Sequence, residues 1–122
     1  MEAEKPGLAG IVPAVILPDG YRGKILLLSI DWDGEGMVAL RSGDLWHREI
    51  LRNTRAEMVR RGLADAQVEE LGGAHLCFET DGSIRIWGGS DEYGACDREF
   101  AARLVRASRP GCAVIVSTVE IT

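Results

Sequence analysis

Two histidines, His47 and His75, are the side chains of this sequence whose ordinary pKa lies near neutrality. His47 stands in the run Leu45-Trp46-His47-Arg48-Glu49, where a helix is expected to begin. Free N–H groups and the positive dipole end of a helix start attract anions. An imidazole at this position can exchange a proton with a water beside a bound phosphoryl group, although the pattern also fits an ordinary surface histidine.

A glycine-rich segment at residues 88–94 offers a second anion-binding loop, between a predicted strand and a predicted helix. It has the sequence Gly-Gly-Ser-Asp-Glu-Tyr-Gly and contains Ser90, Asp91 and Glu92. Adjacent glycines let the backbone approach a ligand closely, and the Ser90 hydroxyl with nearby N–H groups can bind phosphoryl oxygens. The same composition is common in plain structural turns. The sequence therefore indicates two helices that each begin at a loop suited to an anion, above all a phosphoryl group.

The elements that must position these residues predict an α/β (α+β) fold. We expect a single domain over residues 1–122, with a mixed sheet of about six strands and one helix packed on each face. The runs at residues 23–31 and 112–119 are almost continuously apolar, which predicts two central strands covered on both sides. Other strands are expected at residues 11–17, 37–40, 68–71 with 74–79, and 83–87, with a hairpin turn at Asp81-Gly82.

Apolar residues recur with helical spacing in two segments. Asp44 is expected to cap the first helix, which ends at Arg60-Arg61-Gly62. The second ends before Pro110-Gly111, because proline cannot continue a helix. The two stripes consist of Ile50, Leu51, Thr54, Met58 and Val59, and of Cys96, Phe100, Ala101, Leu104 and Val105.

Composition limits the partners and the compartment. With 14 basic against 19 acidic residues, the net charge is -5, which argues against nucleic acid as a partner. No apolar run is long enough to cross a bilayer, and the start of the chain lacks a secretory signal, so no membrane partner is expected. The three cysteines, Cys77, Cys96 and Cys112, have no ligand spacing and fit small buried residues in a reducing compartment. We expect a cytoplasmic monomer without a cofactor.

Three other phosphate chemistries are disfavoured by the sequence. Where thiol phosphatases carry an Arg after their nucleophilic Cys, this chain has Ser83, Ala102 and Thr118. The run Asp31-Trp32-Asp33-Gly34 is similar to the nucleophile loop of aspartate-based phosphatases, but Glu35 follows in place of Thr or Val, which favours a solvated turn. No glycine-rich run ends in Gly-Lys-Ser/Thr, so the phosphate-binding loop of nucleotidases is missing.

Taken together, the segments resemble the Janus/ocnus family, whose members include a protein histidine phosphatase. The resemblance extends over residues 12–117, nearly the whole chain, and keeps the order of the landmarks. The aromatic-His pair, the Leu-Gly-Gly turn and the Ser-x-x-Tyr-Gly loop are moderately specific alone and strong as an ordered set. The landmarks are Val12-Pro13, residues 20–30 with Lys24, Trp46-His47, Glu70-Leu71-Gly72-Gly73, Ile84-Arg85-Ile86-Trp87-Gly88 and residues 90–94.

The resemblance implies that His47 is the catalytic base or proton relay and that no metal is required. It implies that Lys24 helps to bind the substrate. The alternative is that Lys24 is a strand-edge lysine whose charged end extends into solvent. Phosphate-binding roles are likewise implied for Trp46 and Arg48 beside His47, and for Ser90, Asp91 and Glu92 in the opposite loop.

The chain departs from the family at two places. Ala74-His75 follows the glycine-rich turn where the family has an Arg, so His75 is the phosphate-binding residue available there. Asp91 and Glu92 stand where the family has small or apolar residues. Both changes weaken the attraction for a doubly negative phosphoryl group, unless Arg48 and Arg85 face the site.

These observations predict a metal-independent hydrolase that removes phosphoryl groups from P–N bonds, such as protein phosphohistidine. Its substrate would be a phosphorylated protein or a small phosphoramidate. The alternative is a non-catalytic phosphate- or phosphopeptide-binding module that has kept the fold. A third hypothesis, which we consider weaker, joins His47 and His75 with Asp91 or Glu92 in a metal site.

Overall fold

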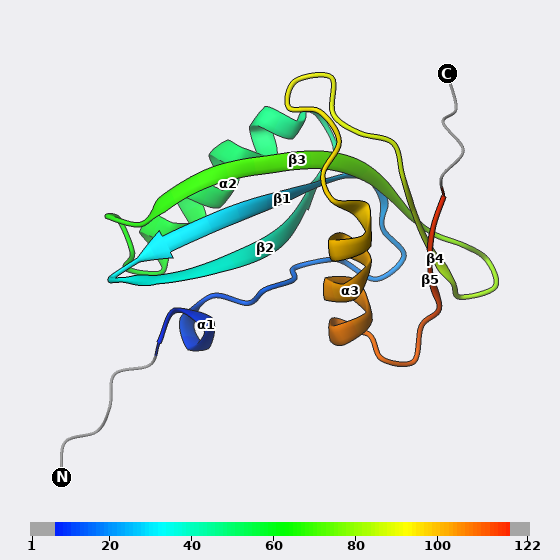
Figure 1. The fold of residues 1–122 in the computed structure, drawn as a ribbon, viewed down its shortest axis with the longest axis horizontal. Coiled ribbons are helices and arrows are strands. Elements are labelled where there is room, and N and C mark those ends of the chain that lie inside the picture. The colour runs from blue at the N-terminus through cyan, green and yellow to red at the C-terminus, as the bar shows by residue number, and fades with distance from the viewer. Residues whose placement is uncertain (1–6, 118–122) are drawn as a thin grey trace, which may run out of the picture.

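The structure is a computed structural model, and it describes residues 7–117. The centre of the described chain is a five-stranded sheet with the order β2-β1-β3-β4-β5 (Figure 1). Neighbouring strands are antiparallel except β4 and β5, which are parallel, so the predicted mixed sheet is confirmed with one strand fewer among the described residues. The elements are α1 (Leu8–Ile11), β1 (Arg22–Trp32), β2 (Glu35–Gly43), α2 (His47–Arg60), β3 (Gln67–Phe78), β4 (Ile84–Trp87), α3 (Arg98–Ser108) and β5 (Val114–Val116).

The two longer helices cover opposite faces of the sheet, with α2 behind it and α3 in front of it in Figure 1. Side chains alternate along β1, so Ile25 and Leu27 pack in the apolar cluster with α3, whereas Leu26, Leu28 and Ile30 pack in the cluster with α2. All five are at most 2% exposed, which confirms a central strand covered on both faces, and the cluster with α2 also includes Leu8 of α1. No helix within residues 7–117 has the length and apolar character needed to span a membrane.

An irregularity in β3 changes its alignment with β1. Leu28 lies opposite Glu70, but Leu26, two residues away on the same strand, lies opposite Gly73. The interval in β3 is therefore one residue longer than the facing interval in β1. Such a β-bulge leaves one residue unpaired and reverses the alternation of the side chains that follow it.

The bulge decides which β3 side chains face α2. Before it, Val68 packs in the α2 cluster; after it, Ala74 and Leu76 pack in the α3 cluster. His75 lies between Ala74 and Leu76 in sequence and therefore points to the α2 face. An uninterrupted strand would have placed it on the opposite face.

A buried ion pair fixes α2 on the sheet. Arg41 Nε of β2 lies 2.8 Å from Glu57 Oε1, and Arg61 Nε lies 2.7 Å from Glu57 Oε2. Arg41 also donates a hydrogen bond to the Pro13 carbonyl, at 2.9 Å, and so ties down the segment before β1. Burial by itself would raise the pKa of Glu57, but the hydrogen bonds and charges of the two arginines outweigh it and hold the pKa below its ordinary value of 4.5.

The strand predicted at residues 11–17 was wrong. The segment begins with the end of α1 and continues as irregular chain beside β2. Its backbone bonds to β2 run from Leu40 N–H to Ala14 O, at 2.7 Å, and from Ile16 N–H to Leu40 O, at 3.2 Å. Pro13 lacks an N–H donor and cannot extend this pairing into a ladder.

The last predicted strand is shorter than expected and is not central. β5 pairs only with β4 and ends the sheet of the described residues, and the predicted residues 118–119 lie outside those residues. A short apolar run fits an edge strand as well as a central one, and Ile115 in β5 is 47% exposed. The hairpin at Asp81-Gly82 is confirmed, with a bond of 2.8 Å from Glu79 N–H to Ser83 O.

Both helix starts differ from the prediction. α2 is preceded by Trp46 at the N-cap, with no side-chain hydrogen bond, so Asp44 does not cap it. α3 begins at Arg98, and its start is closed by Asp97 Oδ1, which accepts a hydrogen bond of 3.0 Å from Phe100 N–H. Residues 88–94 therefore do not lead directly into the second helix, contrary to the prediction; the anion-suited helix start is that of α2.

Candidate functional site

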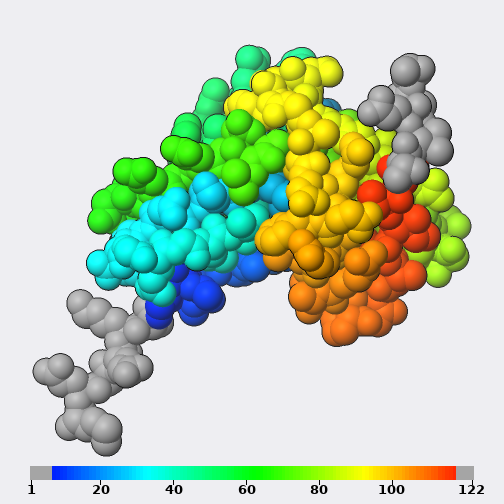
Figure 2. Space-filling model, viewed as in Figure 1, coloured from blue at the N-terminus to red at the C-terminus, as the bar shows by residue number. Residues whose placement is uncertain are grey.

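The start of α2 and the loop at residues 88–95 meet beside the middle of β3, at the top of the molecule in Figure 2. Between them lies a cavity of about 250 Å³. Arg48 and Ser90 are the predicted site residues that do not line this cavity, and both contact Glu92, which does. The lining residues are Lys24, Trp46, His47, His75, Gly89, Asp91 and Glu92.

His47 is the first residue of α2 and is held in one orientation by β3. Its side chain is buried, and Nε2 lies 3.2 Å from the Ala74 carbonyl oxygen. A carbonyl oxygen can only accept, so Nε2 carries the hydrogen and Nδ1 keeps the lone pair of the neutral ring. No buried side-chain nitrogen among the described residues lacks a hydrogen-bond partner, and the bond of this ring uses Nε2. Nδ1 is therefore not sealed off from solvent, in a residue that lines the cavity.

His75 is the second imidazole of the cavity. Its ring centre lies 6.0 Å from that of His47, and the ring stacks on Trp87 of β4 at 5.7 Å. Lys24 of β1 lies directly opposite in the strand register. Burial lowers the pKa of His75 below its ordinary value of 6.5, and His47 and Lys24 lower it further, while Asp91 acts in the other direction. The ring is therefore neutral at pH 7.

Gly73 lets three segments meet at the site. A Cβ at this position would lie 2.5 Å from His47 Cδ2, 2.6 Å from His47 Nε2 and 3.0 Å from Ser90 Cβ. Its backbone N–H donates to Gly94 O, at 3.0 Å, and its carbonyl accepts from Cys96 N–H, at 3.0 Å. Any side chain here would separate α2 and the 88–95 loop from β3.

A carboxylate already occupies the start of α2. The Arg48 N–H donates to Glu92 Oε1, at 3.3 Å, and Arg48 Nε lies 3.6 Å from Glu92 Oε2. The Arg48 guanidinium also lies 5.4 Å from the centre of the Trp46 ring. The predicted anion position at this helix start is therefore filled by a side chain of the chain itself, which a phosphoryl group would have to displace.

Ser90 orders the loop rather than lining the cavity. It is 8% exposed, and its Oγ accepts hydrogen bonds from the N–H groups of Glu92 and Tyr93, both at 3.2 Å. The backbone of Ser90 also bonds to Gly94 in both directions, at 3.1 and 2.8 Å. These bonds close a tight loop that presents Gly89, Asp91 and Glu92 to the cavity.

Other candidate groups lie away from the cavity or are unreactive. Arg85 pairs with Glu79, at 3.3 Å, and is not a lining residue, so it does not compensate for the two acids. Burial raises the pKa of the Cys96 thiol to about 11. Cys77 is also buried, so both fit the prediction of small buried residues, whereas Cys112 is only partly buried. Among residues 7–117, no three His, Cys, Asp or Glu side chains are grouped as metal ligands, and the site predicted as the weaker alternative does not form.

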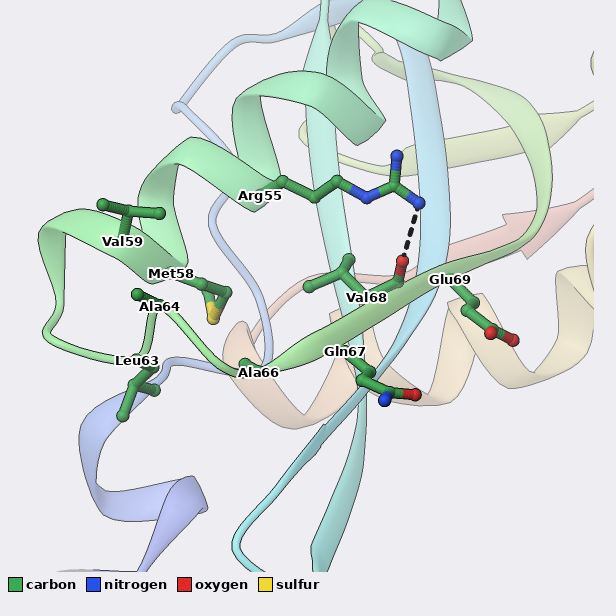
Figure 3. Close-up of a pocket in the computed structure, with 9 residues that line it drawn as sticks. All are labelled: Arg55, Met58, Val59, Leu63, Ala64, Ala66, Gln67, Val68 and Glu69. Atoms are coloured by element: carbon green, nitrogen blue, oxygen red, sulfur yellow. Dashed lines mark hydrogen bonds between the residues drawn. The ribbon is translucent and has the colours of Figure 1, made fainter.

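A larger hollow of about 390 Å³ lies between the end of α2 and the start of β3 (Figure 3). One side is closed by Arg55, which donates to the Val68 carbonyl at 3.0 Å. Its lining residues include no histidine, cysteine or hydroxyl group, so it offers no nucleophile and no proton carrier near neutral pH. The chemistry of the described residues is concentrated in the smaller cavity.

The cavity lies within a region of the chain that matches a known protein family. The model of the Janus/Ocnus family matches residues 14–112, which include every residue that lines the cavity. The chain belongs to the Janus/Ocnus family. No curated protein matches the chain.

Within this Janus/Ocnus chain, sequence reasoning missed two parts of the site. Trp87 and Gly73 were noticed as landmarks, but neither was expected to hold a histidine in place. Trp87 pairs with His75 across β3 and β4, a contact that depends on register and not on local sequence. The crowding at Gly73 depends on α2, which precedes it by many residues.

We predict that Gly73→Ala destabilises the protein through the His47 ring. The added methyl forces the ring away from Ala74 O, and overpacking of this kind costs about 1–3 kcal/mol. Gly111→Ala is the matched control, because a Cβ there meets nothing within 4 Å. In urea unfolding, Gly73→Ala should lower the midpoint while Gly111→Ala leaves it close to wild type. Equal midpoints for the two variants would contradict the crowding at Gly73.

We also predict that the two loop acids differ in their effect on anion binding. Glu92→Gln removes the carboxylate from the start of α2 and should tighten phosphate binding roughly tenfold, more at low than at high salt. Asp91→Asn should have a smaller effect, because Glu92 is the acid that accepts the Arg48 N–H at the start of α2. Calorimetric titration with phosphate at two salt concentrations measures both. If Glu92→Gln binds phosphate no better than wild type, its carboxylate does not compete for the site.

Proposed function

We propose that this Janus/Ocnus protein is a metal-independent hydrolase that removes phosphoryl groups from P–N bonds, such as that of protein phosphohistidine, and that it works as a cytoplasmic monomer. The observation that carries the proposal is the orientation of His47. Because Nε2 is bound to the Ala74 carbonyl, the basic Nδ1 remains for the cavity. The resemblance to a protein histidine phosphatase, carried by Trp46-His47 and the Ser90 loop, supports the choice of a P–N substrate.

The proposed reaction needs positioning and charge stabilisation more than covalent chemistry. A water oxygen forms a bond to phosphorus while the P–N bond breaks, which yields phosphate and the free nitrogen base. His47 Nδ1 takes a proton from the water, and a proton returns to the departing nitrogen. Lys24 and the backbone N–H groups at the start of α2 balance the charge of the phosphoryl oxygens.

A non-catalytic phosphate- or phosphopeptide-binding module is the second candidate. The contact of Glu92 with Arg48 favours it, because a carboxylate at the helix start opposes a doubly negative substrate. Such a module would bind phosphate without turning over any phosphoramidate. Turnover by the purified protein therefore separates the two candidates.

We predict that His47→Ala lowers the hydrolysis of phosphoramidate about a hundredfold or more, the usual range for the loss of a general base. Because the ring is buried, His47→Asn is the companion variant that leaves less empty space. Chelator treatment of the wild-type protein should leave its activity intact. Activity of both variants within a few-fold of wild type would remove His47 from the mechanism, and loss with chelator that one divalent ion restores would make the enzyme metal-dependent.

We predict that sulfate binding strengthens as pH falls through the lowered pKa of His75, because protonation adds a positive charge to the cavity. Sulfate remains a dianion across this range, so the change reports the protein. Lys24, His47, Asp91 and Glu92 also line the cavity, so His75→Asn identifies the share of His75. Calorimetry between about pH 5 and pH 8 should give a steeper dependence for wild type than for the variant. Equal slopes would show that protonation of His75 does not affect sulfate binding.

A further inference from the structure

Trp46, which lines the cavity, and Leu45, which precedes it in the chain, are largely exposed apolar side chains. Leu45 is 69% exposed and Trp46 is 53% exposed, and both lie in the short loop between β2 and α2. Adjacent large apolar residues at the mouth of a site are characteristic of surfaces that bind another molecule, and tryptophan is enriched where such binding is strongest.

Two acidic residues also line the cavity. Asp91 and Glu92 are exposed residues of the 88–95 loop and line the cavity together with Trp46. Glu92 is paired with Arg48, whereas Asp91 has no ion-pair partner among the described residues. A basic group that approached the mouth would therefore meet an unpaired carboxylate at Asp91.

The size of the cavity limits what can enter it. A volume of about 250 Å³ lies below the range of about 300–1,000 Å³ that is usual for pockets enclosing a whole ligand. One side chain with its phosphoryl group fits the interior, and the residues on either side of it must stay at the rim. They would contact the exposed apolar residues Leu45 and Trp46 and the acidic residues of the 88–95 loop.

We infer that the rim formed by Leu45, Trp46 and Asp91 docks an extended segment of a protein substrate that carries an apolar residue and a Lys or Arg beside its phosphohistidine. This inference rests on the proposed function and narrows it from P–N compounds in general to proteins. The apolar residue packs on Leu45 and Trp46. The basic residue pairs with Asp91, so free phosphoramidate uses the cavity without using the rim.

The test compares two phosphohistidine peptides of equal length, one with Leu and Lys beside the modified residue and one with Ser and Glu. The small substrate phosphoramidate is the third probe. Leu45→Ser should raise the KM of the Leu/Lys peptide about tenfold with little change in kcat. The reason is that the Leu45 side chain is shielded from water only when the peptide is bound. Phosphoramidate turnover should stay at the wild-type rate. Val59→Ser is the control, since Val59 is 59% exposed but lies at the hollow of Figure 3.

Preference of the wild-type protein for the Leu/Lys peptide, reduced by salt and by Leu45→Ser alone, would support docking at the rim. Equal KM values for the two peptides, or an unchanged KM in Leu45→Ser, would overturn it. So would a monomer-dimer equilibrium that Leu45→Ser abolishes, because a second copy would then cover the rim. If no probe is hydrolysed, the proposed function fails, and fluorescence anisotropy with labelled peptides still decides whether Leu45 contributes to binding.

Discussion

Between Glu70 and Gly73, β3 has one residue more than the facing stretch of β1, and the cavity depends on that extra residue. It reverses the alternation of β3, so that His75 points to the face covered by α2. It also leads into Gly73, where the absence of a side chain lets the His47 ring rest against the strand. The bulge thus allows His47 and His75, which come from different elements, to line the same cavity.

The rest of the fold holds the start of α2 in place beside β3. The buried pair of Arg41 and Glu57 fixes α2 along the sheet, and the apolar clusters on the two faces fix the sheet between the helices. The first turn of α2 can then present an N–H group and an imidazole to a position defined by β3. Because His47 Nε2 is bound to a carbonyl of that strand, this hydrogen bond also determines which ring nitrogen is basic.

The electrostatics of the site are a balance between opposing groups. Lys24 and the start of α2 attract an anion, while Asp91 and Glu92 repel it. Glu92 accepts a hydrogen bond from the Arg48 N–H, so this N–H group at the helix start has a partner even without a ligand. His75 contributes a charge only when protonated, and its burial beside Lys24 and His47 opposes protonation. Under the proposed function, such a site would bind a phosphoryl group less tightly than one with a permanent guanidinium, and contacts outside the cavity would contribute more to the choice of substrate.

Local sequence patterns predict the elements with strong periodicity: the buried β1, the two longer helices, the hairpin at Asp81-Gly82 and the placement of His47 at a helix start. These depend on neighbours within a turn or a strand, which local spacing records. Tertiary structure alone decided the edge position of β5, the irregular course of residues 11–17, the bulge in β3, the stacking of Trp87 on His75 and the contact of Glu92 with the start of α2. Each of these is set by residues far apart in the chain, and pairing across such distances depends on register and packing that no local pattern encodes.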